Sequence, residues 1–297
     1  MYITYIPNIN HKKSNNIRSE YEGVGAQYQR IIALLSIAKR HNLKYIHIPI
    51  KVGHNYNNDP EWHNKWDKMF NIQKLSDTID YSTIQKQHIY TNPITLDNLL
   101  NHNNNDNDNE LSILNCYTNP FNIFDKNSNY YLSYIQNDLI NAYDENNSNR
   151  TLIYDKTKTS IAIHIRVFNQ QDDIMNFNNY MNNVDSRHYM TCDLYLSLIK
   201  KIKNQYQNSD IHIFSQEHLF DIHYKRLRDI EYIKIHFDDL DTFDTFHHLC
   251  KSDVLVMAPS SLSIIAAFYN KNTVMFLPFN HPPSLKSWII LDPSKLI

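Results

Sequence analysis

Glycine is scarce in this chain, which contains only 3 glycines among 297 residues. A phosphate-binding loop of the G-x-x-x-x-G-K type and a dinucleotide fingerprint with three glycines both need more glycine at one place. Gly23 and Gly25 lie together, but no third glycine follows them and no acidic residue ends the strand expected after them. The sequence therefore argues against an NAD-type site.

Cysteine is also rare. Cys116, Cys192 and Cys250 are the 3 cysteines, and they show neither C-x-x-C nor zinc-type spacing. An odd number without such spacing is typical of a reducing compartment, so we expect a cytoplasmic protein. His247 and His248 are neighbours on an expected helix and face different directions, and the H-E-x-x-H motif is absent. We therefore expect no metal site.

Long apolar runs and a dominant charge are missing as well. No stretch approaches the roughly 18 uninterrupted apolar residues that mark a membrane-spanning helix. Residues 1–6 lack the charged start of a signal peptide. We expect no transmembrane segment, which leaves peripheral membrane contact open. The net charge of −2 gives no general electrostatic reason to expect nucleic-acid binding.

Alternating strands and helices dominate the second half of the sequence. Alternation of this kind predicts a doubly wound parallel sheet. Strands are expected at 161–167, 211–214, 232–237, 254–257 and 273–277, and helices at 192–206, 217–228, 242–250 and 261–269.

The first half predicts a second α/β lobe. Its expected strands are 2–6 and 43–50, and its expected helices lie around 28–38, 62–70 and 130–143. The glycine loop at 22–29 indicates a backbone with positive φ or close to a ligand, or a simple turn before the helix. The Asn-rich segment 101–109 is expected to be disordered, and 144–150 to link lobes at 1–150 and 151–297.

The strand expected at 161–167 ends on a cationic pair. Alternation puts its isoleucines on one face and Ser160, Ala162, His164 and Arg166 on the other. A guanidinium offers both a fork of donors and a fixed charge, which suits a phosphate or carboxylate. The alternative is an ordinary strand with two solvated polar residues.

Hydroxyl groups follow two of the expected strands. Ser215 follows 211–214, whereas Ser260 and Ser261 follow 254–257 and open a helix. Helix N-termini bind anions through their N–H groups, although these serines could instead only cap the helix. Because carboxyl ends of parallel strands share one edge, the pattern predicts a nucleotide diphosphate site.

Several short motifs resemble those of the fucosyltransferases. Residues 22–29 (EGVGAQYQ) are similar to the glycine-rich opening of α-1,2-fucosyltransferases. His164-Ile165-Arg166 resembles the His-x-Arg motif shared by α-1,2-, α-1,6- and protein O-fucosyltransferases. Phe214–Glu217, Asp244–Cys250 and Ala258–Ser263 resemble three further stretches of the family in the same order. The chain departs from the family at Ala26, Asn169 and Gln216.

The resemblance implies a GT-B-like fold of two Rossmann-like lobes, an acceptor-side lobe at 1–150 and a donor lobe at 151–297. It implies inverting, metal-independent transfer of a sugar, L-fucose from GDP-fucose, to a hydroxyl of a glycan or glycoconjugate, with no further cofactor. Arg166 would stabilise the departing diphosphate. The donor-binding residues would be Gly23, Gly25, Gln27, His164, Arg166, Ser215, Asp244, Ser260 and Ser261.

Inversion needs a base for the acceptor hydroxyl. Asp172 and Asp173 rank first because they follow the cationic strand end, ahead of Glu22 and Glu217. Two alternatives to a transferase stay open at this stage. One is a degenerate relative that binds a nucleotide sugar or glycan without transfer, and the other is a structural α/β protein.

Overall fold

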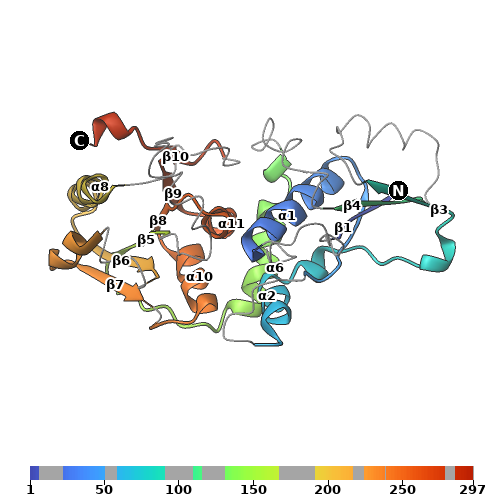
Figure 1. The fold of residues 1–297 in the computed structure, drawn as a ribbon, viewed down its shortest axis with the longest axis horizontal. Coiled ribbons are helices and arrows are strands. Elements are labelled where there is room, and N and C mark those ends of the chain that lie inside the picture. The colour runs from blue at the N-terminus through green and yellow to red at the C-terminus, as the bar shows by residue number, and fades with distance from the viewer. Residues whose placement is uncertain are drawn as a thin grey trace, which may run out of the picture. The chain divides into compact units, whose positions relative to one another are not determined.

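The chain divides into two compact units in a computed structural model (Figure 1). Unit 1 is residues 1–149 with 283–285, and unit 2 is residues 150–282 with 286–297. Each unit is an α/β structure around its own parallel sheet, so the expected fold class of two Rossmann-like lobes is confirmed. The structure describes residues 1–6, 23–50, 59–90, 110–115, 131–166, 191–216, 224–237, 239–277 and 285–296.

Unit 1 is built on a four-stranded parallel sheet of order β2-β1-β4-β3. Helix α1 (Val24–Arg40) connects β1 to β2 and is almost completely buried along its middle, as its dense isoleucine and leucine pattern requires. The predicted strand at 43–50 is shorter than expected. The strands are β1 (Tyr2–Ile6), β2 (Lys44–Ile46), β3 (Lys86–Tyr90) and β4 (Glu110–Asn115).

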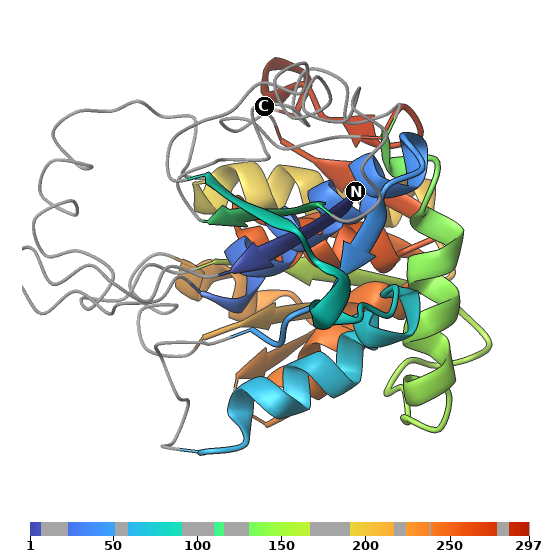
Figure 2. The ribbon, with the colours of Figure 1, turned by 90° about the vertical axis from the view of Figure 1, so that its right-hand side faces the viewer.

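Two helices of unit 1, α2 (Trp62–Phe70) and α6 (Gln136–Asn147), pack against each other (Figure 2). Asn71 ends α2 in the left-handed conformation, and its side-chain amide donates to the carbonyl of Ala142 at 2.8 Å. Asn147 donates in the same way to Met69 at 2.8 Å. The linker prediction for 144–150 is therefore wrong over its first four residues, because they complete α6. Short 3-10 turns lie at η2 (Ile72–Leu75) and η3 (Tyr81–Thr83).

Unit 2 contains a six-stranded parallel sheet of order β10-β9-β8-β5-β6-β7. From β5 the chain moves outward through β6 and β7, then returns to place β8 on the other side of β5. This is the strand order of the Rossmann fold, and the predicted doubly wound sheet is confirmed. The strands are β5 (Thr159–His164), β6 (Ser209–Ser215), β7 (Ile233–Phe237), β8 (Val254–Met257), β9 (Thr273–Phe276) and β10 (Ile289–Ile290).

The helices of unit 2 cover both faces of this sheet (Figure 1). Helix α8 (Cys192–Gln205) lies on one face, and α10 (Thr242–Lys251) and α11 (Ser261–Tyr269) lie on the other. The bounds of all three agree with the sequence prediction to within one residue. The α8 face is an apolar core built from buried isoleucines of β5 and β6 and from the stripe on α8.

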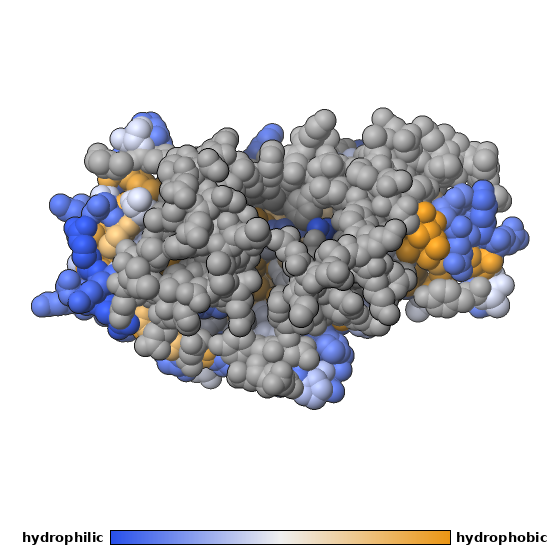
Figure 3. Space-filling model, viewed as in Figure 1, coloured by the Kyte–Doolittle hydropathy of each residue, from blue (hydrophilic) through white to orange (hydrophobic). Residues whose placement is uncertain are grey.

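Two predictions for unit 2 need correction. The strand expected at 161–167 ends at His164, so Arg166 lies beyond it. The helix expected at 217–228 lies outside the described residues up to residue 223, and Lys225–Asp229 forms the 3-10 helix η6. Leu227 anchors η6 in the core while the rest of the turn is exposed, and hydrophilic side chains gather over it in Figure 3. A last turn, η7, spans Pro293–Lys295.

None of the described helices is long and apolar enough to cross a bilayer. The segment 101–109 lies outside the described residues.

Candidate functional site

The strand order of unit 2 places a topological switch point between β5 and β8. These strands are hydrogen-bonded neighbours, and the chain leaves them in opposite directions along the sheet. In open α/β sheets, ligands bind in the crevice outside the carboxyl ends of the strands at such a point. The residues that follow β5 and β8 are therefore the candidates for ligand binding in unit 2.

Arg166 follows β5 on a backbone that the neighbouring strand holds in place. The Ile165 N–H donates to the Phe214 carbonyl at 2.9 Å, and the Ser215 hydroxyl donates to the Ile165 carbonyl at 2.8 Å. Ile165 itself is buried in the apolar core. Ser215 thus positions the residue before Arg166, a role that its place in the sequence did not reveal.

His164 is the last residue of β5, and although the residue is only partly buried, its ring nitrogen Nδ1 is buried. Its Nδ1 atom has no hydrogen-bond partner among the described residues. Burial, together with the charge of Arg166, lowers the pKa of His164 to about 3, so the ring is neutral at physiological pH. A neutral imidazole beside a guanidinium provides one fixed charge and one additional hydrogen-bonding group at the switch point.

The connection from β8 to α11 supplies backbone N–H groups at the same switch point. Ser260 is the N-cap residue of α11, but its side chain makes no capping hydrogen bond, so the interpretation that it caps the helix is wrong. Instead, the Ser263 hydroxyl accepts a hydrogen bond from the Ala258 N–H at 3.1 Å. The first N–H groups of a helix have no intrahelical partner, which makes this turn suitable for an anion. Ser261 is the first residue of α11.

Asp244 lies in the first turn of α10, where its carboxylate pairs with Arg150. The Asp241 side chain caps this helix by accepting from the Asp244 N–H at 2.7 Å. Asp244 is therefore held between a cation and the helix backbone.

The remaining described candidates belong to unit 1. Gly23 is the N-cap of α1 with φ of −61°, and Gly25 lies inside that helix. The prediction of positive φ is therefore wrong, whereas close approach of this backbone to a ligand stays a prediction. Gln27 is completely buried in α1. Asp172 and Asp173 lie outside the described residues, so their role as base stays a prediction.

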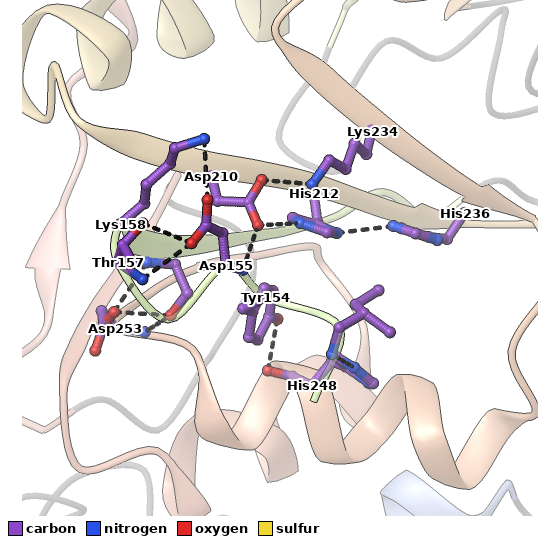
Figure 4. A network of polar contacts seen from close by, with 12 residues as sticks. Tyr154, Asp155, Thr157, Lys158, Asp210, His212, Lys234, His236, His248 and Asp253 are labelled. Carbon is purple, nitrogen blue, oxygen red and sulfur yellow. Dashed lines mark hydrogen bonds and ion pairs between the residues drawn. The ribbon is translucent and has the colours of Figure 1, made fainter. Parts of the chain in front are cut away.

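A buried polar network on β6 and β7 was missed from the sequence (Figure 4). Its centre is Asp210, which accepts hydrogen bonds from His212, Lys234 and the Asp155 N–H, each at 2.8 Å. The alternation of polar residues with isoleucines in β6 is the signal that could have revealed it. Among the described residues, no three His, Cys, Asp or Glu side chains are arranged to hold a metal ion.

Among the comparisons with known proteins, matches come from solved structures. No family model matches the chain, and no curated protein matches it. Crystal structures of POFUT1 do match. The complex with GDP has a TM-score of 0.48 at 11% identity, over 91% of this chain and 94% of that one. A complex with GDP-fucose has a TM-score of 0.48 at 10% identity, over 98% and 97% of the two chains. The apo form gives the same score at 10% identity, over 93% and 97%.

Proposed function

We propose that this protein is an inverting glycosyltransferase whose unit 2 binds the diphosphate of a nucleotide sugar. The observation that carries the proposal is the strand order, which puts Arg166 and the N-terminus of α11 after the two strands of the switch point. A guanidinium and helix N–H groups are together suited to the charge that develops on a departing diphosphate. The His-x-Arg motif at His164 and Arg166 supports this assignment.

In this proposal each group of unit 2 has a defined role. Arg166 neutralises the leaving diphosphate, and Ser215 positions the backbone before it through the Ile165 carbonyl. His164, as a neutral imidazole, forms a hydrogen bond to the donor. Ser260 and Ser261 present the first turn of α11 to a phosphate, and Asp244 contacts the nucleoside. The donor-binding roles of Gly23, Gly25 and Gln27 in unit 1 stay predictions from the motif resemblance.

The finer assignments follow from the motif resemblance. The donor is GDP-fucose, the acceptor is a hydroxyl of a glycan or glycoconjugate, and Asp172 or Asp173 removes its proton. No cofactor or metal takes part, so the transfer rate should be the same with and without EDTA. An α-1,2 linkage is the first product to look for, because the motif at 22–29 resembles that group.

The first experiment is a thermal-shift titration of the purified chain with GDP, UDP and ADP. A ligand that binds the native state raises Tm with the logarithm of its concentration. We expect GDP to do so, and GDP-fucose, which is bound in one of the matching POFUT1 crystals, is the donor for transfer assays. No shift with any of the three would overturn the proposal. A shift without donor hydrolysis or transfer would favour the degenerate binding protein, consistent with the departures at Asn169 and Gln216.

Arg166→Lys tests the mechanism. An ammonium keeps the charge but loses the two parallel donors of the guanidinium. Loss of one charge-assisted hydrogen bond, worth about 1.5–3 kcal/mol, predicts that kcat/KM falls about 10- to 100-fold.

The matched control is Arg228→Lys. In the wild type Arg228 is exposed, and its guanidinium lies 4.8 Å from the centroid of the Phe237 ring. This variant should transfer at the wild-type rate. Equal activity of the two variants at the wild-type level would remove Arg166 from the reaction.

A further inference from the structure

A chain of hydrogen bonds links two carboxylates through two histidines in unit 2. His212 Nε2 lies 2.8 Å from Asp210 Oδ2, and His212 Nδ1 lies 2.8 Å from His236 Nε2. His236 Nδ1 lies 2.7 Å from Asp239 Oδ2, in the turn between β7 and α10. Figure 4 shows the first two of these contacts running from Asp210 through His212 to His236.

The number of hydrogens in this chain is set by its chemistry. Each of the three contacts needs one hydrogen, and an ionised carboxylate supplies none. The four ring nitrogens must therefore carry three hydrogens, whereas two neutral imidazoles carry two. The chain is complete only when the pair holds one additional proton.

Asp210 is ionised, as this count requires. Burial by itself would raise the pKa of Asp210, but the hydrogen bonds from Lys234, the Asp155 N–H and His212 outweigh it and lower the pKa well below its usual value. Asp239 has a side chain that is 53% exposed, so its carboxylate faces water as well as His236.

The surroundings indicate which ring is charged. Burial lowers the pKa of His212 although Asp210 opposes that shift, so His212 is the neutral member. His236 stacks on Phe214 with ring centroids 5.0 Å apart and 20° between planes, a contact that favours a cation. His236 then donates to both His212 and Asp239.

The remaining charged and titratable groups leave the cluster balanced. Lys234 adds one positive charge beside Asp210, and Tyr154 and His248 are neutral because burial raises the pKa of Tyr154 and lowers that of His248. Asp244 of α10 is matched by Arg150. With the additional proton, two carboxylates face two cations, whereas without it the cluster has an unmatched negative charge.

We propose that His212 and His236 together hold one proton more than two neutral imidazoles, and that loss of this proton to solvent releases Asp239 and the turn leading into α10. After the loss, His236 keeps its Nε2–H for His212 and turns a lone pair toward the Asp239 carboxylate. Two acceptors then face each other, and the contact opens. This inference does not depend on the proposed enzymatic function.

The test is NMR of the ring nitrogens in the uniformly ¹⁵N-labelled full chain from pH 5 to 9, with His236→Gln to assign the signal. We expect a histidine with two ring protons at the acid end that loses one within this range. In Asp239→Asn, the midpoint should move about one pH unit lower, because the partner carboxylate is gone. Asp193→Asn, which removes another exposed carboxylate of unit 2, should leave the midpoint unchanged.

Hydrogen exchange at residues 239–244 provides the second readout, corrected for the intrinsic effect of pH. Protection should fall several-fold in the wild type as pH rises through the midpoint, and it should already be low in Asp239→Asn at acid pH. A single ring proton on His236 across the whole range would overturn the inference. So would a midpoint that Asp239→Asn does not move, or protection that does not change with pH.

Discussion

The two faces of the sheet in unit 2 are built from the same strands, but one is apolar and the other carries a polar network. On one face Ile211 and Ile213 of β6 pack with α8 in a core of aliphatic side chains. On the other face Asp210 and His212 of the same strand are equally buried but lie in a hydrogen-bonded network. Burial therefore does not distinguish the faces, because the difference lies in what each side chain requires of its neighbours.

The polar face is stable only because its groups have partners. A buried polar atom without a partner costs about 1–3 kcal/mol, whereas a buried methylene needs only contact. The Tyr154 hydroxyl donates to the His248 carbonyl at 2.9 Å, and the Ile153 N–H donates to His248 Nε2 at the same distance. One face thus contributes stability that is independent of pH, and the other makes unit 2 sensitive to protons.

The largest expected effect comes from opening the apolar face. Ile213→Ala removes a completely buried side chain and leaves a cavity between β6 and α8. We expect the free energy of unfolding to fall by about 2–5 kcal/mol, measured by urea denaturation. Ile289→Ala, at a side chain that is 43% exposed, is the control and should change it by less than about 0.5 kcal/mol. Similar losses in both variants would contradict the assignment of the core to the α8 face.

An intermediate loss of stability is expected at acid pH, through protonation of His164 at the carboxyl end of β5. Its pKa is about 3 in the folded chain because of burial and Arg166, and about 6.5 when unfolded. The unfolded state therefore binds the proton first, and this contribution to stability is lost as pH falls from about 6.5 toward 3. Between pH 7 and 5 the loss is about 2 kcal/mol.

The variant His164→Asn isolates this contribution. The free energy of unfolding is measured by urea denaturation at pH 7 and at pH 5. Its fall between these two pH values should be smaller in the variant than in the wild type, by about 2 kcal/mol. Asp210 does not confuse the comparison, because its carboxyl takes up its proton below this window. An unchanged pH dependence would show that the His164 ring is not held neutral.

The smallest expected effect concerns the N-terminal caps of α8 and α11, the helices on the two faces of the sheet. Thr191 caps α8 by accepting from the Leu194 N–H at 3.3 Å, whereas the side chain of Ser260 caps nothing on α11. Thr191→Ala should lower stability by about 1 kcal/mol, and Ser260→Ala by less than about 0.5 kcal/mol. Under the proposed function, only Ser260→Ala should also weaken GDP binding, by about 3- to 10-fold. A large stability loss in Ser260→Ala would mean that it does act as a cap.

The helices α10 and α11 and the strand β8 show how far the sequence reaches. Each is short, its residues suit its structure, and polar or small residues bound it, so its limits follow from local preferences. The doubly wound sheet follows from the alternation of such elements. The strand predicted at 161–167 extends three residues beyond the end of β5 at His164, because the apolar-polar alternation continues past the point where the strand ends.

The sequence predicted which residue types form the candidate site better than it predicted the contacts that these residues make. Arg166, Ser260 and Ser261 stand at strand and helix ends that the pattern already marks. The sequence did not reveal that the Ser215 hydroxyl donates to the Ile165 carbonyl, because these atoms come from distant parts of the chain. It also did not reveal that the Ser260 side chain leaves α11 uncapped.

By itself, the sequence determined the class of fold, the alternation of strands and helices over most of unit 2, and which strand ends carry cations and hydroxyls, because these follow from local periodicity and side-chain chemistry. It did not predict β3, β4 or β10. Only the tertiary structure decided that β8 returns beside β5, that His164 Nδ1 is buried with no hydrogen-bond partner in the described part of the chain, and that His212 contacts His236. The physical reason is that strand pairing, burial and shared protons involve groups far apart in the chain. These groups come together only when the sheet has formed.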